Sequence, residues 1–300
     1  MPLPNFLIIG AAESGTTFLY LGLRQHPDVF LCPATEPYFF AYEGEALQRA
    51  FCGPGDGQQY KDTVTQLSDY LTFFEPARAK AIGERSAVYL YSSKAAERIQ
   101  HYMPQAKLIA ILRQPAERAF SHYLKLRQEG RESLGFAEAL QQEAARIRQG
   151  WGPAWHYRQF GFYAAQLERY LARFDRKQIR VYLHDDWRAD SAAVLRDAFG
   201  FLEVDSALGP PVAPRYQVRR QTRNRAWHNF LTHPHPLKEW LRPLFPKPLA
   251  DWLWTWLHDR NLTAPRLDPQ IRAELTEGYR TDILRLQDLL GRDLSLWLKV

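Results

Sequence analysis

Short apolar runs alternate with longer amphipathic stretches over the first two thirds of the chain. The run at 107–112 is apolar at every position after Lys107, which is typical of a parallel strand buried on both faces. Similar runs predict further buried strands or strand ends, at 5–9, 29–31, 82–86 and 179–183. Gly10 ends the first of them.

Helices are expected between these strands. The pattern predicts them at 17–23, 61–75, 93–102, from 116 onward, at 136–149, at 163–174 and at 191–199. Alternating strands and helices favour an α/β fold with three layers, in which helices flank a central, mostly parallel sheet. Residues 208–214 (LGPPVAP) resemble a hinge, and the chain beyond them has a helical pattern interrupted by prolines. We expect one domain over residues 1–300 with a helical C-terminal part.

Composition and charge narrow the class of ligand. The chain has 300 residues, of which 46% are hydrophobic and 24% charged, as in ordinary globular proteins. Its formal net charge is +6. A positive balance fits an anionic partner, such as a nucleotide, a nucleic acid, an acidic glycan or a membrane surface, without choosing among them.

Cysteine content and hydropathy indicate the cellular setting. Cys32 and Cys52 are the only cysteines, and no Cys/His cluster has zinc spacing, so neither a disulfide framework nor a metal site is expected. The apolar run Phe6–Ile9 is too short for a signal-peptide core. No stretch approaches the roughly 20 apolar residues of a membrane span. These features predict a cytoplasmic protein, or a soluble catalytic domain separated from its anchor.

A glycine-bounded loop, Gly10 to Thr17 (GAAESGTT), joins the first strand to the first helix. Backbone N–H groups in such a loop, together with the helix N-terminus, attract phosphate groups. The G-x-x-x-x-G spacing matches a nucleotide phosphate loop, but Thr16-Thr17 follow where a Walker motif requires Lys-Ser/Thr. An ATP-hydrolysing enzyme or kinase is therefore disfavoured. A tight turn capped by Thr16 or Thr17 remains an alternative for this loop alone.

Several ordered motifs together resemble the sulfotransferases that use 3′-phosphoadenosine-5′-phosphosulfate (PAPS), in particular the heparan sulfate N- and 3-O-sulfotransferases and their bacterial relatives. They are PNFLIIGAAESGTTFLYLGLRQHPDVF, TEPYFF, LIAILRQPAERAFSHY, GFYAAQLERYLARFDRKQIRVYLHDD, LRDAFGFLEVD and LDPQIRAELTEGYRTDILRLQDLLGRDLSLWL. The resemblance implies a P-loop-like fold and transfer of a sulfuryl group from PAPS to an acceptor, which leaves the nucleotide PAP. It implies no metal.

The resemblance also implies which residues hold the donor. The 5′-phosphosulfate would be held by Ser14, Gly15, Thr16 and Thr17. The 3′-phosphate would be held by Arg113 and Ser121 of the pattern RxPxxRxxSxY, and Arg260 and Arg266 would lie in a segment closing over it. A planar arginine fork and a serine hydroxyl are both suitable donors to phosphate.

One position departs from the family pattern. Glu13 stands where the family usually has a lysine that neutralises charge on the bridging oxygen of the donor. A carboxylate there would be repelled by the donor's anionic groups. Three explanations are open: another cation such as Arg85 or Lys94 takes the lysine's place, Glu13 points to solvent, or the chain is weakly active or inactive.

The acceptor must lose a proton as it attacks, which requires a general base. The resemblance implies that Glu36, in T-E-P-Y-F-F, is this base. Tyr38 stands two residues later, where the family often has histidine. Arg85, in the segment Glu84-Arg85-Ser86, aligns with a segment that carries an active-centre lysine. The predicted catalytic positions are therefore Glu36, Arg85 and the substituted Glu13.

The acceptor itself is not fixed by the sequence. Residues 215–225 (RYQVRRQTRNR) contain five arginines, which suits an acidic ligand or a solvated loop. The Trp-rich segment 227–257 is compatible with core helices, a sugar-stacking wall or a lipid-contacting surface. A glycan, a lipid or a small molecule bearing a hydroxyl or amine thus remains possible. No nucleic-acid recognition motif accompanies the arginines. A degenerate sulfotransferase fold that binds PAP or another anion without turnover is the non-enzymatic alternative.

Overall fold

The computed structural model describes residues 3–47, 50–208, 221–222, 262–263 and 265–299. Contacts divide the chain into two compact units, Met1–Tyr216 with Asp268–Val300, and Gln217–Leu267. In the second unit, β6 (Gln221–Thr222) pairs antiparallel with β7 (Leu262–Thr263). The expected single domain over 1–300 stays a prediction. The Trp-rich segment 227–257 and Arg260 lie outside the described residues.

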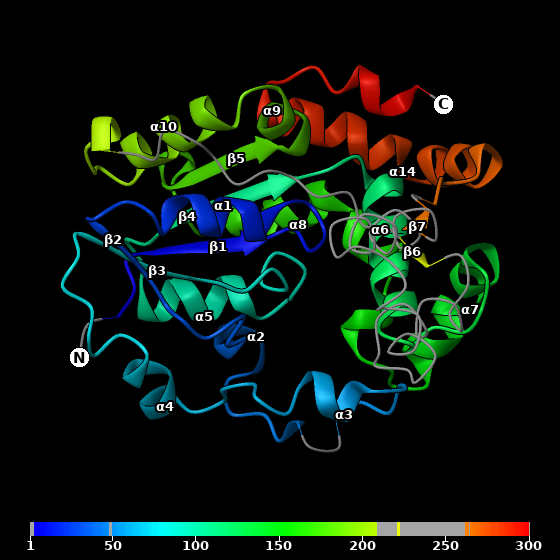
Figure 1. The fold of residues 1–300 in the computed structure, drawn as a ribbon, viewed down its shortest axis with the longest axis horizontal. Coiled ribbons are helices and arrows are strands. Elements are labelled where there is room, and N and C mark those ends of the chain that lie inside the picture. Colours follow the sequence, from blue (N-terminus) through cyan, green and yellow to red (C-terminus); the bar gives the residue numbers. More distant parts are fainter. Residues whose placement is uncertain (1–2, 48–49, 209–220, 223–261, 264, 300) are drawn as a thin grey trace, which may run out of the picture. The chain divides into compact units, whose positions relative to one another are not determined.

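A parallel sheet forms the centre of the first unit (Figure 1). Its strands are β1 (Phe6–Gly10), β2 (Val29–Leu31), β3 (Ala81–Arg85), β4 (Lys107–Leu112) and β5 (Ile179–Leu183). They lie in the order β2-β3-β1-β4-β5, and every neighbouring pair is parallel. The predicted α/β fold with a central parallel sheet is confirmed.

Helices lie on both sides of this sheet, and further helices lie away from it (Figure 1). They are α1 (Thr16–Leu23), α2 (Phe39–Tyr42), α3 (Asp56–Gln59), α4 (Leu67–Thr72), α5 (Ala95–Tyr102), α6 (Pro115–Gln128), α7 (Phe136–Arg148), α8 (Tyr163–Leu171), α9 (His184–Ala189), α10 (Ser191–Phe201) and α14 (Pro269–Leu290). None of these described helices is long and apolar enough to cross a membrane.

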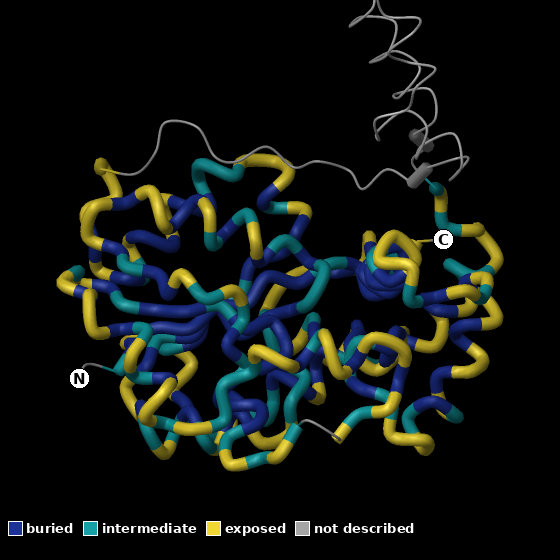
Figure 2. The backbone as a smooth tube through the Cα atoms, turned by 60° about the horizontal axis from the view of Figure 1, so that its bottom comes forward, coloured by how far each residue is buried: buried dark blue, intermediate teal, exposed yellow. Residues whose placement is uncertain are grey.

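The sheet is buried on both faces. On one face, Phe6 and Ile8 of β1 pack in a cluster with Leu19 of α1 and Leu195 of α10. Successive strand residues point to opposite faces, yet all five residues of β1 are buried. In Figure 2 the strands accordingly run as buried tube through the centre of the unit. Burial on both faces explains why these strands appear in the sequence as continuous apolar runs.

Three short elements differ from the prediction. The helix expected at 61–75 is confined to α4, because Val64 N–H donates to the Pro37 carbonyl at 3.0 Å and holds the preceding residues as a connection. The TEPYFF segment, which lies outside every predicted helix, ends in helix α2, and α9 was not predicted. Helices of four to six residues are too short to show a helical period.

The C-terminal helix α14 has well-defined ends. The Asp268 carboxylate accepts from the N–H groups of Gln270 and Ile271, and Pro269 occupies the first helical position. Gly291 ends the helix in the left-handed conformation. Helix α14 packs against α6 and α8, which confirms the helical C-terminal part over this range and supports the helix that carries Ser121.

Candidate active site

The phosphate-loop candidate lies at the carboxyl edge of the sheet. Strand β1 leads into residues 11–15, and its neighbours on either side are β3 and β4. Because the strands are parallel, all three end at the same edge, where open α/β sheets bind ligands. Arg85 ends β3 and Arg113 follows β4 directly. The two arginines therefore flank the loop from opposite sides.

The loop backbone is fixed by close packing. A Cβ on Gly10 would lie 2.7 Å from Cβ of Leu90, so only glycine fits there. Gly15 has φ of 110° and leads directly into α1. Thr16 and Thr17 form the first turn of α1, where N–H groups have no intrahelical partner. Ser14, between Gly10 and Gly15 in the loop, is fully buried. The loop is built to present backbone N–H groups to an anion.

Arg85 connects the loop to the predicted base. Its Nη1 lies 2.8 Å from Oε1 of Glu36, 3.4 Å from Oγ1 of Thr16 and 3.3 Å from Oγ1 of Thr17. Its side chain is only 11% exposed, and its Nε–H has no acceptor among the described residues. Lys94, the other candidate for the missing cation, instead pairs with Glu45 at 2.8 Å.

Both carboxylate oxygens of Glu36 are engaged. While Oε1 binds Arg85, Oε2 accepts from the Tyr38 hydroxyl at 2.5 Å. Glu36 and Tyr38 both have left-handed φ angles, 55° and 60°, which are unusual outside glycine. The Ser86 hydroxyl accepts the Tyr38 N–H at 3.1 Å and holds this turn. Burial and the Glu36 charge raise the pKa of Tyr38 well above its ordinary value, so Tyr38 remains a donor.

A buried carboxyl group that the sequence did not single out supports this turn. Glu84 is fully buried and accepts from the Ser86 hydroxyl at 2.9 Å and from the Tyr70 hydroxyl at 3.3 Å. Burial raises the pKa of Glu84 to about 7. In the sequence, the only indication that Glu84 has a role was its position beside Arg85 at a strand end. Glu84 thus holds Ser86, which in turn holds Tyr38.

Glu13 turns toward the opposite side of the loop, to the residues predicted for the 3′-phosphate. The Ser121 hydroxyl lies 3.2 Å from Oε2 of Glu13, and Nη1 of Arg113 lies 3.5 Å from the Glu13 carbonyl oxygen. Arg113 also approaches Glu117 at 3.8 Å. Glu13 therefore does not simply point to solvent, which was one of the expected explanations.

His184 also lies beside the loop, although the sequence gave no signal for it. It begins α9 directly after β5, and its ring lies 3.5 Å from where a Cβ on Gly15 would be. Burial, and secondarily the charge of Arg113, lowers the pKa of His184 to about 4. The imidazole is therefore neutral at physiological pH.

The two acidic positions share one cavity of about 50 Å³. Glu13 and Glu36 line it together with Tyr38, His122 and Lys125. Arg118, next to this wall, is fully buried and donates to the Tyr157 carbonyl.

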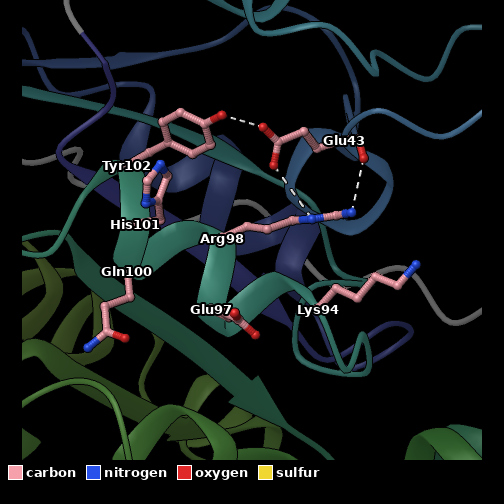
Figure 3. A pocket seen from close by; sticks show the side chains of 7 residues that line it. All are labelled: Glu43, Lys94, Glu97, Arg98, Gln100, His101 and Tyr102. Atoms are coloured by element: carbon pink, nitrogen blue, oxygen red, sulfur yellow. Dashed lines mark hydrogen bonds and ion pairs between the residues drawn. The ribbon is translucent and has the colours of Figure 1, made fainter.

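A larger hollow of about 640 Å³ lies along α5 (Figure 3). Arg98 crosses it and donates to the carbonyls of Phe40 at 3.2 Å and Glu43 at 3.0 Å, at the end of α2. Tyr102 also donates to Glu43. No residue of the phosphate loop lines this hollow. The candidate site is therefore the smaller cavity, where the predicted residues converge.

The described structure does not test two of the predicted donor ligands. Arg260 lies outside the described residues, and Arg266 is exposed and belongs to the second unit. Both stay predictions. Among the described residues, no three His, Cys, Asp or Glu side chains gather as metal ligands would, which by itself says nothing about the reaction.

Known proteins are similar to this chain in both sequence and fold. The bifunctional heparan sulfate N-deacetylase/N-sulfotransferase 4 of Mus musculus is 29% identical in sequence over 99% of this chain. The bifunctional heparan sulfate N-deacetylase/N-sulfotransferase 1 of Homo sapiens is 27% identical, also over 99% of this chain. The chain spans about a third of the length of these curated relatives, 31% in each case. A sulfotransferase of Alicyclobacillus acidocaldarius is 33% identical, covers both chains completely and superposes with a TM-score of 0.77. The model described as "Sulfotransferase family" matches residues 4–207. The chain therefore belongs to the sulfotransferase family.

Proposed function

We propose that the chain transfers a sulfuryl group from PAPS to a hydroxyl or amine acceptor, with Glu36 as the general base. Family membership supports sulfuryl transfer as the reaction class. The observation that carries the rest is the position of Arg85, whose Nη1 contacts both Glu36 and the hydroxyls of Thr16 and Thr17. One cation thus joins the anion-binding loop to the base.

The residues present fit such a donor. Gly15, Thr16 and Thr17 would hold its 5′-phosphosulfate through the first N–H groups of α1. Arg113 and Ser121 would hold its 3′-phosphate, because both lie on the far side of the loop from Arg85 and already contact an anionic residue. When bound, PAPS supplies the sulfuryl group and the leaving nucleotide.

Residues of this chain would accept the proton, orient the base and stabilise the developing charge. Glu36 would accept the acceptor's proton, and Tyr38 orients its carboxylate by a hydrogen bond from the phenol. Arg85 would place positive charge next to Thr16 and Thr17, where negative charge increases during transfer. This role replaces that of the lysine absent at position 13. Arg85 and Lys94 were both candidates for it, and only Arg85 contacts the loop.

The acceptor class is proposed from the relatives. Their names include a heparan sulfate N-sulfotransferase activity, and the net charge of +6 suits an acidic glycan. We therefore expect a glycan to be the acceptor. Turnover assays with lipids and with small phenols test the other two acceptor classes. A cytoplasmic location remains our expectation, alongside that of a soluble catalytic domain.

A second candidate is a protein that binds the nucleotide without turnover. Glu13 favours it, because a carboxylate stands in the phosphate loop. It predicts PAP binding with no sulfation of any acceptor, whereas the proposed enzyme converts PAPS to PAP in the presence of at least one of the glycan, lipid and phenol acceptors.

Calorimetric titration with PAP and with AMP tests the donor site. We expect wild-type protein to bind PAP more tightly than AMP, and Arg113→Ala to lose most of that preference. Arg196→Ala is the matched control, because Arg196 is an exposed arginine of α10. Equal affinity for PAP and AMP, or no binding of either, would overturn the proposed donor. ATP turnover with Mg²⁺ in the same preparation would indicate a kinase or ATPase instead.

A further inference from the structure

Ser121 already has an anionic partner within the chain. Its hydroxyl donates to Oε2 of Glu13 at 3.2 Å, and Arg113 donates to the carbonyl of the same residue at 3.5 Å. The residues are about a hundred positions apart in sequence. The loop thus delivers a carboxylate to the hydroxyl that the proposed function assigns to a phosphate of the donor.

The backbone at position 13 is held in place. Glu13 has φ of 64°, a left-handed conformation in which residues other than glycine are uncommon. The next residue, Ser14, is fully buried, and its N–H donates to the Ala11 carbonyl at 3.3 Å. The contact with Ser121 therefore starts from a fixed loop and not from a freely moving segment.

We propose that Glu13 is a specificity-determining residue for the donor nucleotide, acting as an internal anion in competition with the 3′-phosphate for Ser121. This inference rests on the proposed function. A nucleotide with a 3′-phosphate must displace the carboxylate to reach Ser121, whereas a nucleotide without one leaves the contact intact. Glu13 therefore lowers the preference for PAP over AMP that Arg113 and Ser121 would otherwise give.

Other charges around this contact define the control. The Glu117 carboxylate approaches Arg113 at 3.8 Å and binds Arg272 at 3.3 Å, whereas the Ser121 hydroxyl donates to Glu13. Removing its charge changes the electrostatics near Arg113 without freeing Ser121. Like Glu13→Gln, Glu117→Gln removes one negative charge from a residue close to Arg113. Unlike Glu13→Gln, it leaves the hydrogen bond between Ser121 and the Glu13 carboxylate in place.

Titrations with PAP and AMP on Glu13→Gln, Glu117→Gln, Ser121→Ala and the double variant of positions 13 and 121 test the proposal. Because Glu13→Gln removes the negative charge that competes with the 3′-phosphate for Ser121, this variant should bind PAP roughly tenfold more tightly. Its affinity for AMP should be nearly unchanged. Glu117→Gln should have a smaller effect on PAP. In the Ser121→Ala background, substitution at position 13 should lose most of its effect.

Several outcomes would overturn the inference while leaving the proposed function standing. They are a Glu13→Gln variant that binds PAP no better than wild type, one that gains equally for AMP, and a gain that persists undiminished without Ser121. Glu13→Ala serves as a second variant if the glutamine form does not give a cooperative thermal transition. Failure of every variant to bind PAP would overturn the proposed function and the inference together.

Discussion

Arg85 and Glu36 form an ion pair in which the guanidinium nitrogen nearest the carboxylate, 2.8 Å away, is also the one nearest the threonine hydroxyls of the phosphate loop. An anion bound at the loop would compete with Glu36 for this nitrogen. Because the other Glu36 oxygen accepts from Tyr38, loss of the Arg85 contact would expose one lone pair of the carboxylate. If Glu36 is the base, as we propose, Arg85 would couple donor binding to its activation.

Replacing the proposed base should abolish turnover and spare donor binding. We expect Glu36→Gln to lower turnover of PAPS by about 10²–10⁴, the usual contribution of general base catalysis, while PAP binds at least as tightly as to the wild type, because a neutral amide competes less for Arg85. Turnover with an accepted acceptor and calorimetry with PAP measure the two effects. Glu45→Gln, which removes a carboxylate paired with Lys94, should change neither. A Glu36→Gln variant with wild-type turnover would exclude this residue as the base.

Replacing Arg85 should affect the transfer step more than nucleotide binding. Loss of one preorganised donor costs about 10²–10³ in rate, so we expect a decrease of this size in Arg85→Ala. Arg85→Lys should recover part of the rate, because it restores charge but not the fork geometry. Lys94→Ala is the control, and single-turnover kinetics are the measurement. Equal losses in Arg85→Ala and Lys94→Ala would contradict the role proposed for Arg85.

Two of the buried titratable groups near the site, His184 and Glu84, should give the free energy of unfolding opposite dependences on pH. His184 has a pKa of about 4 in the folded state against an ordinary value of 6.5. Between these values only the unfolded state binds the proton, so stability falls as pH decreases from 6.5 to 4. Glu84 has a pKa of about 7 against 4.5. Between these values only the folded state holds the proton, so stability falls as pH rises.

Single variants should reveal these opposing slopes. In the pH range between its folded and unfolded pKa values, each group changes the free energy of unfolding by about 1.4 kcal/mol per pH unit. The two changes have opposite signs, so they nearly cancel from pH 4.5 to 6.5. His184→Gln should make the protein lose stability as pH rises through this range. Glu84→Gln should make it gain stability instead. Urea denaturation at three pH values measures both, and identical pH profiles for the two variants would contradict the assignment.

A glycine in β3 is required by packing against β1. A Cβ on Gly83 would lie 2.5 Å from the Phe6 ring. Gly83→Ala should therefore destabilise the protein by about 1–3 kcal/mol, as overpacked cores do. Gly57→Ala, where a Cβ would meet nothing within 4 Å, should change stability by less than about 0.5 kcal/mol. Thermal melts of the two variants would show no difference if the Phe6 contact can relax freely.

The sequence predicted the strands best, because burial on both faces leaves an unbroken apolar run. Residues 107–112 and 179–183 are strands with the bounds expected. The helix expected at 61–75 is shorter because the fold of its first half depends on a contact with Pro37, distant in sequence. Local patterns hold no information on such contacts.

The sequence predicted which residues belong to the candidate site, but not how they contact one another. The sequence identified Arg85 as a candidate cation, and it lies beside Thr16 and Thr17, while its catalytic role stays a prediction. Glu84 was not singled out, since a glutamate at a strand end gives no sign that it is fully buried. The contact of Glu13 with Ser121 joins residues from separate elements and required the three-dimensional structure.

The strand order also sets a length scale. Because β1 lies between β3 and β4, Arg85 and Arg113 are carried by strands two positions apart, a separation of roughly 10 Å at about 4.8 Å per strand. Backbone hydrogen bonding maintains that spacing whatever side chains the loop carries. For the proposed donor, this spacing would set the distance between the two anionic groups that the site can hold. The residue at position 13 would then change the affinity for such a ligand but not the distance between its two anionic groups.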